Sequence, residues 1–163
     1  FGYNHYQIAP DLVAIGKGLG NGYPVSALAI NRETAGELED RTFNYVQSHQ
    51  NDPLGAAVAH EVIMVLATDG LIFRATILGK KFLQELQTLT NSSQITEVRG
   101  RGLMFAVDFA ETAVGDKTYD QLLEMGYIVC NRGGMFRIDP PLMIEEADFL
   151  GFVEAFRGLL ADE

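Results

Sequence analysis

The first thirty residues contain two short apolar runs that are separated by a glycine-rich segment. Residues 11–15 (DLVAI) and 25–30 (VSALAI) are mostly apolar, and residues 16–22 between them read GKGLGNG. Apolar runs of this length, bounded by glycine, are typical of strands in a sheet that is covered on both faces. We therefore expect two strands, the first of them buried, joined by a loop that contains Lys17.

The next segment combines a short helix with a loop. Asn31 is a residue type that caps helices, and it predicts a helix over residues 32–38. Residues 42–53 (TFNYVQSHQNDP) are polar and aromatic, with neither a helical nor a strand period, so we interpret them as a loop. This loop leads into the two longest periodic segments of the chain.

Two helices are predicted between residues 53 and 89. Pro53 suits the first turn of a helix, and either Asp52 or Asn51 can cap it. This helix is expected to break near residues 68–70, and a second helix is expected over residues 71–89. The apolar residues of the second helix recur at helical spacing: Ala75, Leu78, Phe82, Leu86 and Leu89.

Beyond residue 90 shorter elements alternate. Residues 103–109 alternate apolar and other residues with period two, which predicts a strand. We expect a helix over residues 119–125, strands at residues 127–130 (YIVC) and 135–139 (MFRID), and a final helix. The apolar face of that last helix comprises Phe149, Phe152, Val153, Phe156 and Leu159. The change of character near residue 90 indicates two lobes and an α/β fold overall.

Composition narrows the class of protein. Of 163 residues 47% are hydrophobic, enough for a packed core, and 22 acidic against 12 basic residues give a formal net charge of -10. The chain lacks the basic stripe that nucleic acid binding requires, so no nucleic acid partner is expected. No apolar run approaches the ~18 residues of a membrane span, and no membrane partner is expected.

The number and spacing of the cysteine and histidine residues narrow the class of protein further. The single cysteine, Cys130, excludes an internal disulfide framework and indicates a reducing compartment, most simply the cytoplasm. Cys130 is expected to be inert packing in an apolar strand. His5, His49 and His60 lack metal-ligand spacing, so no metal site is expected.

The glycine-rich loop fits neither of two common phosphate-binding patterns. A P-loop would have glycine at position 11 and Ser or Thr at position 18, where the chain has Asp11 and Gly18; a dinucleotide fingerprint would have glycine where Asn21 stands. Lys17 then has two interpretations. Composition favours a solvated loop lysine. The functional alternative is a lysine at the end of a buried strand that forms a Schiff base.

The residues around Lys17 resemble a known family. Residues 10–30 (PDLVAIGKGLGNGYPVSALAI), together with FGYNHYQIAPD before them, resemble the active-site lysine segment of the class III aminotransferases. These are pyridoxal-phosphate enzymes of fold-type I. The resemblance implies that Lys17 carries pyridoxal 5′-phosphate as a Schiff base and moves a proton during catalysis.

A second segment, residues 48–63 (SHQNDPLGAAVAHEVI), is similar to the loop before the long interdomain helix of that family. In the family a threonine five residues before a proline donates to the cofactor phosphate of the partner subunit. That position is Ser48 here, with Pro53 as the landmark, so the resemblance implies a homodimer in which Ser48 reaches the partner's cofactor. The alternative is a serine that hydrogen-bonds within its own loop. His49 is given no catalytic role.

Two further segments lie in the last third of the chain. Residues 98–109 (VRGRGLMFAVDF) are similar to the strand-turn-strand that opens the family's small domain; here Gly100 and Gly102 are expected to shape the turn, with Arg99 solvated. Residues 135–144 (MFRIDPPLMI) look like the segment whose arginine holds the substrate carboxylate, which is Arg137 here. Arg137 paired with a nearby acid is the alternative interpretation, and Arg132 is the competing candidate.

The resemblance implies a fold-type I chain made of the end of a large domain (residues 1–65) and an interdomain helix with a C-terminal small α/β domain (residues 66–163). It implies transfer of an amino group from an amino acid or amine to a 2-oxo acid. The family's phosphate loop, ring-stacking aromatic and pyridine-nitrogen aspartate lie upstream of the matched segments, so we expect an incomplete fragment that is inactive alone. The alternatives are an aminomutase, racemase or decarboxylase on this scaffold, or a cofactor-free fragment that dimerises or binds a partner.

Overall fold

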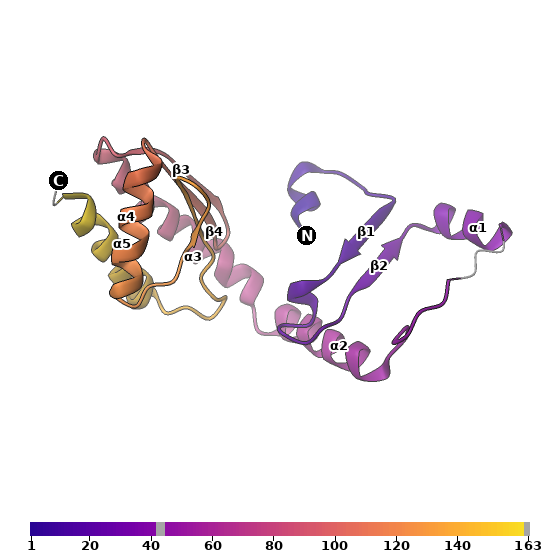
Figure 1. Ribbon diagram of the computed structural model, residues 1–163. Helices are drawn as coiled ribbons and strands as arrows, with labels where there is room; N and C mark the ends of the chain where they lie inside the picture. Colours follow the sequence, from indigo (N-terminus) through magenta and orange to yellow (C-terminus); the bar gives the residue numbers. More distant parts are fainter. Residues whose placement is uncertain (42–44, 162–163) are drawn as a thin grey trace. The chain divides into compact units, whose positions relative to one another are not determined.

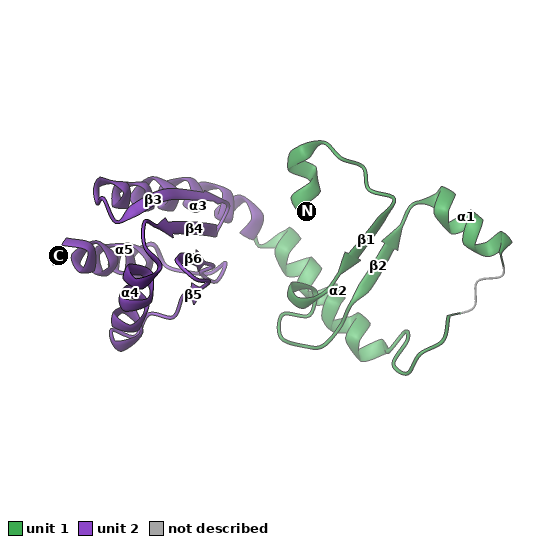
Figure 2. Ribbon diagram, turned by 45° about the horizontal axis from the view of Figure 1, so that its top comes forward, with its two compact units in different colours: residues 1–69 green, residues 70–163 purple. Residues whose placement is uncertain are grey.

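A computed structural model describes residues 1–41 and 45–161 of the chain (Figure 1). The predicted loop at residues 42–53 is described only from residue 45 onward. The chain divides into two compact units, residues 1–69 and residues 70–163, which are coloured separately in Figure 2. We refer to residues 1–69 as unit 1 and to residues 70–163 as unit 2.

Unit 1 is built around one antiparallel strand pair. Strand β1 (Leu12–Ile15) pairs with β2 (Ala27–Ile30) in the register Leu12↔Ile30 to Ile15↔Ala27. The remaining elements are the 3₁₀ turns η1 (Gly2–Tyr6) and η2 (Lys17–Leu19) and the helices α1 (Arg32–Asp40) and α2 (Pro53–Thr68). Both predicted strands and both predicted helices of this region are present.

The helix ends follow from their capping residues. The Asn31 side chain accepts a hydrogen bond from the backbone N–H of Thr34 at 2.8 Å, so Asn31 caps α1 as expected. Asp52 caps α2 by accepting from the backbone N–H of Leu54 at 3.0 Å, and Pro53 is the first helical residue. The predicted break after α2 is confirmed, with Gly70 at φ 67° before the next helix.

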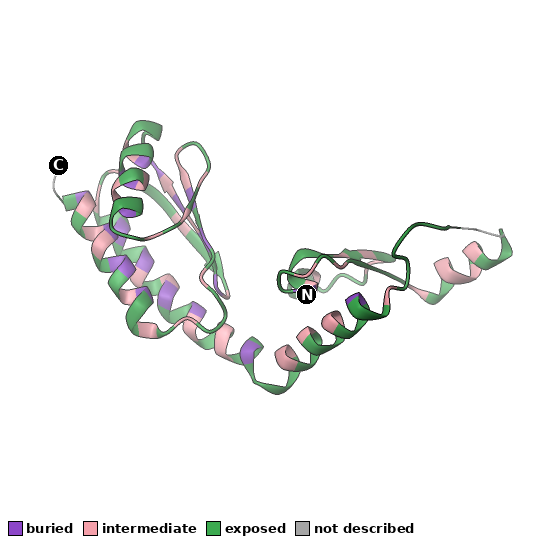
Figure 3. Cartoon of the chain, turned by 60° about the horizontal axis from the view of Figure 1, so that its bottom comes forward, coloured by how far each residue is buried: buried purple, intermediate pink, exposed green. Residues whose placement is uncertain are grey.

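The predicted burial of the first strand is wrong within this chain. Leu12 is 55% exposed in β1, and Leu28 is 63% exposed in β2. Among the described residues of unit 1 no hydrophobic side chain is buried, as the predominance of green and pink in Figure 3 shows. Apolar runs report a tendency to be covered, and two strands with two helices do not supply the covering layers.

Unit 2 is a four-stranded antiparallel sheet with helices packed on one face. The strand order is β3-β4-β6-β5. The strands are β3 (Ile95–Arg101), β4 (Met104–Phe109), β5 (Cys130–Asn131) and β6 (Met135–Ile138). The helices are α3 (Leu71–Gln87), the 3₁₀ turn η3 (Thr88–Asn91), α4 (Thr112–Glu124) and α5 (Glu146–Ala161).

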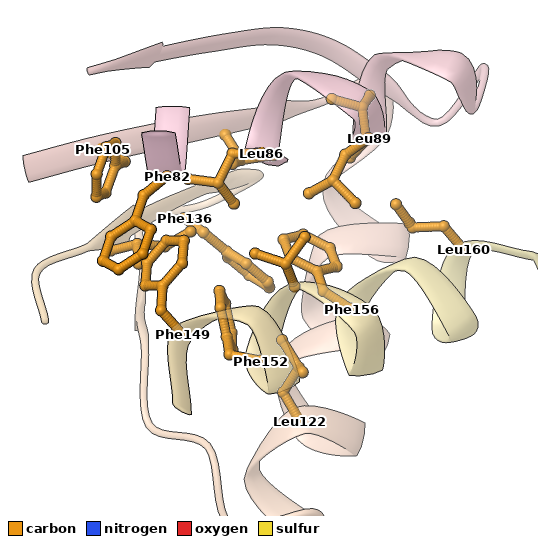
Figure 4. Packing of buried hydrophobic residues seen from close by; sticks show 14 of the residues in the cluster. Phe82, Leu86, Leu89, Phe105, Leu122, Phe136, Phe149, Phe152, Phe156 and Leu160 are labelled. Atoms are coloured by element: carbon orange, nitrogen blue, oxygen red, sulfur yellow. The ribbon is translucent and has the colours of Figure 1, made fainter. Parts of the chain in front are cut away.

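Aromatic side chains fill the space between the sheet and the helices (Figure 4). Phe82 of α3 stacks on Phe149 of α5 with ring centroids 3.9 Å apart, and Phe136 of β6 meets Phe109 of β4 edge-on at 4.7 Å. The period-two pattern of residues 103–109 and the helical faces of α3 and α5 are therefore confirmed as the sources of this core.

Several local predictions for unit 2 are wrong. Residues 127–129 are not a strand, because only Cys130 and Asn131 pair with β6. Helix α4 begins at Thr112 rather than at residue 119. Gly100 lies inside β3, where a Cβ would come within 2.5 Å of the Phe105 ring, so it permits a close approach instead of shaping the turn. Only Gly102, at φ 55°, occupies the turn.

Candidate active site

The lysine of the glycine-rich loop begins the 3₁₀ turn that follows β1. The turn is closed by hydrogen bonds from the Leu19 N–H to the Gly16 carbonyl and from the Gly20 N–H to the Lys17 carbonyl, both 3.1 Å. Lys17 itself has φ 48°, in the left-handed region that residues with a Cβ rarely adopt. Such a conformation costs on the order of 1–3 kcal/mol and is concentrated at functional sites.

An open pocket of about 450 Å³ lies beside this lysine. Its lining residues are Lys17, Gly22, Tyr23, Pro24 and Val25. Three of the five carry apolar or aromatic surface, and Lys17 supplies the one cation among them. The pocket is therefore a small, largely apolar recess with a primary amine at its edge.

The glycines of the loop differ in whether the structure requires a residue without a side chain at their positions. At Gly20 a Cβ would come within 2.0 Å of the Tyr23 carbonyl oxygen, so no side chain fits there without a backbone shift. Gly22 has φ 103°, which favours glycine. At Gly18 a Cβ would meet no atom within 4 Å. Gly20 and Gly22 are thus required by the backbone conformation of the loop.

Pyridoxal 5′-phosphate can be compared with this recess through the chemistry of its donors. The Lys17 amine is the group that an aldehyde requires, and the apolar wall formed by Tyr23, Pro24 and Val25 suits one face of a planar ring. A phosphate would need further N–H or O–H donors from outside these five residues. The recess fits the aldehyde end of the cofactor and leaves the phosphate to other groups.

Ser48 lies in a turn before α2 and is exposed. The turn is held by the Gln50 N–H, which donates to the Gln47 carbonyl at 3.3 Å, and by the Asp52 N–H, which donates to the His49 carbonyl at 3.3 Å. Ser48 is not among the residues that line the recess beside Lys17. The two predicted cofactor residues are therefore not brought into one pocket within a single chain.

The backbone of unit 1 contains a concentration of strained residues. Within the described part of the chain every non-glycine residue with positive φ belongs to unit 1: Gln7, Lys17, Asn21, His49 and Asn51. Two of these flank or form the lysine turn and two follow Ser48. Only the two asparagines indicate this strain at the level of sequence, because asparagine tolerates positive φ better than most residues.

Arg137 lies in β6, with Ala106 of β4 and Cys130 of β5 as its cross-strand neighbours. Its Nε lies 2.6 Å from Oδ2 of Asp139, and the two side chains are 44% and 40% exposed. Pairing with a nearby acid, the alternative interpretation of Arg137, is thus present.

Cys130 is exposed, so the expectation that it is inert packing is wrong. Its strand, β5, is short and lies at the edge of the sheet, where it is not covered.

Arg99 and Arg74 form other kinds of contact. Arg99, expected to be solvated, pairs with Asp108 and with Glu97. Hydrogen bonding to Asp108 raises the pKa of the Arg99 guanidinium above its ordinary value, against a smaller opposing effect of desolvation. Arg74 of α3 donates to the carbonyls of Leu142 at 2.5 Å and Ile144 at 2.6 Å, a role that the sequence did not indicate.

No group of three or more His, Cys, Asp or Glu residues that could hold a metal ion occurs among residues 1–41 and 45–161. Across that same part of the chain no single helix is long and apolar enough to cross a membrane, although residues 53–68 and 71–91 reach that length and composition when taken together.

The chain has the two parts that were expected for a fold-type I chain: a strand followed by a lysine turn in unit 1, and a small antiparallel α/β domain in unit 2. The Aminotransferase class-III family matches residues 1–160, and the chain belongs to this family. The predicted fold class and family resemblance are therefore confirmed.

The curated relatives are considerably longer than this chain. Acetylornithine aminotransferase of Mycobacterium tuberculosis is 38% identical over 167 residues, which cover 98% of this chain and 39% of that protein. Ornithine aminotransferase of Schizosaccharomyces pombe is 35% identical, with 97% and 37% covered. The chain thus spans about two fifths of the length of these relatives.

Solved structures match over almost the whole chain. A thermostable (S)-enantioselective omega-transaminase from Thermomicrobium roseum has a TM-score of 0.90 at 29% identity, with 99% of this chain and 39% of that chain covered. A structure described as a transaminase with L-ala also has a TM-score of 0.90, at 27% identity, with 99% and 42% covered. These matches support the arrangement of strands and helices described above.

Proposed function

We propose that the protein to which this chain belongs transfers an amino group from an amino acid or amine to a 2-oxo acid, with pyridoxal 5′-phosphate bound covalently through Lys17. The observation that carries this proposal is the position of Lys17: a strained residue after β1, at the edge of a small apolar recess. Membership of the class III aminotransferase family supports the same reaction.

Bound pyridoxal phosphate would supply an electron sink for the bond that breaks at the substrate carbon. Lys17 has two tasks in this proposal. Its Nζ holds the cofactor through the aldehyde carbon, and in its neutral form Nζ then takes up and returns the proton of the substrate carbon. The η2 hydrogen bonds fix the Lys17 backbone, and Tyr23, Pro24 and Val25 line the same recess as Lys17.

We further propose a homodimer in which Ser48 donates a hydrogen bond to the cofactor phosphate of the second subunit. The exposed position of Ser48, outside the recess of its own Lys17, supports a role toward another copy of the chain. Residues 1–65 would then end the large domain, and residues 66–163 would form the interdomain helix and the small domain. Cys130, the single cysteine, is compatible with a reducing compartment such as the cytoplasm.

Arg137 is proposed to bind the carboxylate of the amino acid or 2-oxo acid, with Arg132 as the competing candidate. A guanidinium presents parallel N–H donors that match the two oxygens of a carboxylate. Because the five residues that line the recess contain no cation besides Lys17 for a phosphate, we expect no transaminase turnover from the isolated 163-residue chain.

Reductive labelling tests the proposed function. The protein is incubated with pyridoxal phosphate, treated with borohydride and digested, and the modified peptide is identified by mass spectrometry. We expect the adduct on Lys17, and we expect Lys17→Ala to abolish it while Lys80→Ala, which removes an exposed helical lysine of α3, leaves it unchanged. Labelling spread evenly over the lysines would refute the assignment.

Acceptor dependence separates a transaminase from other enzymes of this scaffold. We expect amino group release to require a 2-oxo acid, with one amino product formed for each donor consumed. Turnover of an amino acid without any acceptor would instead indicate an aminomutase, racemase or decarboxylase. The absence of a Lys17 adduct would favour the cofactor-free binding fragment, a function that the exposed apolar residues of unit 1 also suit.

A further inference from the structure

The open face of the unit 2 sheet carries a row of four residues, one from each strand. Arg99 lies opposite Ala106, Ala106 opposite Arg137, and Arg137 opposite Cys130. Residues opposite each other in an antiparallel sheet share a face, and the buried Phe105 and Phe136 occupy the other one. Two arginines therefore lie on the same surface, separated by one small side chain.

The two arginines differ in which nitrogens are engaged. In Arg99, Nη1 pairs with Asp108 and lies 3.4 Å from the Glu97 carboxylate, while Nη2 lies 3.4 Å from Oδ1 of Asp108. The terminal fork of Arg99 is therefore occupied by two carboxylates. An arginine in that state has no pair of parallel terminal donors for a further anion.

Arg137 is engaged from its other side. Its Nε forms an ion pair with Asp139, with 2.6 Å between Nε and Oδ2. Within the described part of the chain no side chain or carbonyl occupies Nη1 and Nη2 of Arg137. These two nitrogens form the end-on fork of the planar guanidinium, so the fork that Arg99 uses internally is free in Arg137.

The backbone that carries Asp139 is held on its C-terminal side. Arg74 of α3 donates through Nη1 to the Leu142 carbonyl and through Nη2 to the Ile144 carbonyl. The Ile144 N–H donates to the Pro141 carbonyl at 2.9 Å, and Lys81 pairs with Glu146 at the start of α5. The segment after β6 is thus tied to α3 at several points, which limits the movement of the Asp139 carboxylate.

We propose that Asp139 is a positioning residue for Arg137: by holding Nε, it directs the Nη fork toward the carboxylate of the amino acid or 2-oxo acid. This inference rests on the proposed function of Arg137 and adds the residue that orients it. An arginine side chain has several rotatable bonds, and fixing them before the ligand binds reduces the entropic cost of binding.

The contribution of Asp139 can be separated into an acceptor and a charge. The oxygen beside Nε limits the movement of the guanidinium, whereas the negative charge repels an incoming carboxylate at short range. Asp139→Asn keeps an oxygen acceptor and removes the charge; Asp139→Ala removes both. We therefore expect the affinity for a carboxylate ligand to follow the order Asp139→Asn, at least equal to wild type, above Asp139→Ala.

Steady-state kinetics of the complete holoenzyme with pyruvate as amino acceptor tests this order. Asp139→Ala is expected to raise KM for pyruvate about fivefold with little change in kcat, and Asp139→Asn is expected to stay within about twofold of wild type. KM for an amine donor that lacks a carboxylate should not change. Asp108→Ala, which breaks the other arginine–aspartate pair on the same face, is the matched control and should leave KM for pyruvate unchanged.

Nuclear magnetic resonance of the 163-residue chain gives a readout that is independent of activity. The Arg137 Nε–H signal, assigned by its absence in Arg137→Lys, should be protected from water exchange in wild type and Asp139→Asn and lost in Asp139→Ala. If Asp139→Ala leaves both this signal and KM unchanged, or if both variants raise KM equally, the inference is wrong. If Arg137→Ala leaves KM for pyruvate unchanged, the proposed function of Arg137 fails as well.

Discussion

Unit 1 and unit 2 have very different interiors. In unit 2 the three helices and the sheet bury 17 hydrophobic residues, among them Phe82, Phe136 and Phe156, which are fully buried. In the described residues of unit 1 the buried positions are Gly20, which lies close to the Tyr23 backbone, and Gly55, which lies close to the side chains of Val25 and Tyr23; neither contributes a side chain. The burial of apolar surface that stabilises a domain is therefore concentrated in unit 2.

The candidate chemistry has the opposite distribution. Lys17 and Ser48 belong to unit 1, where every described non-glycine residue with positive φ is also found. A strained backbone persists only when surrounding structure holds it in place. Unit 1 offers little such structure of its own, so its lysine turn depends on contacts that a lone strand pair and two helices do not make.

Separating the two units should have the largest effect on folding of all the changes proposed. We expect residues 70–163 to fold alone, with a cooperative thermal transition, because the hydrophobic cluster lies within that range. Residues 1–69 alone should show no cooperative transition, because a two-stranded sheet is marginal in water. Circular dichroism melting curves of the two fragments check this. A cooperative transition in residues 1–69 would mean that the difference in burial does not govern stability.

Truncating single apolar residues should lower the free energy of unfolding much more in unit 2 than in unit 1. Phe136→Ala should lower the free energy of unfolding by about 3–5 kcal/mol, because Phe136 packs against Phe109 and Phe156 with no exposed surface. Leu28→Ala, in the exposed strand pair, should change it by less than ~0.5 kcal/mol. Urea denaturation measures both, and equal effects would contradict the assignment of the core to unit 2.

The sequence predicted the burial of apolar residues better in unit 2 than in unit 1, and the reason is physical. Periodicity reports which side chains will be covered, and in α3 and α5 the covering elements are part of the same unit, so Phe82 and Phe156 are buried as expected. The apolar run of β1 carries the same kind of signal, yet Leu12 is exposed because no described element covers it. Capping is local: Asn31 was predicted as a cap, and Asp52 was one of two predicted candidates for the cap of α2.

The candidate site was predictable only in part. Family motifs indicated Lys17, Ser48 and Arg137, because motifs preserve residue type at fixed spacing. They could not indicate the left-handed backbone of Lys17, which depends on how the turn closes. Nor could they indicate the contact of Arg74 with the Leu142 carbonyl, because a partner 68 residues away is set by tertiary packing.

A substitution inside the lysine turn tests how far unit 1 depends on its backbone path. Gly20→Ala should distort the turn at a cost of on the order of 1–3 kcal/mol, because the new Cβ would meet the Tyr23 carbonyl. Gly18→Ala is the matched control, since its Cβ would meet open space. We expect Gly20→Ala to reduce pyridoxal phosphate labelling of Lys17 severalfold and Gly18→Ala to leave it near wild type. Equal labelling of both variants would show that the turn tolerates the distortion.

The smallest effect is expected at the cap of α1. Asn31→Ala removes the acceptor for the Thr34 N–H and should cost α1 about 1 kcal/mol. Because α1 contributes no buried residue to the hydrophobic cluster, this loss should stay local. Hydrogen exchange should become faster in residues 34–36 while the exchange rates of α3 and α5 remain unchanged. Faster exchange in α5 as well would mean that the stabilities of the two units are coupled, and the contrast between them would then have to be replaced by a single cooperative unit.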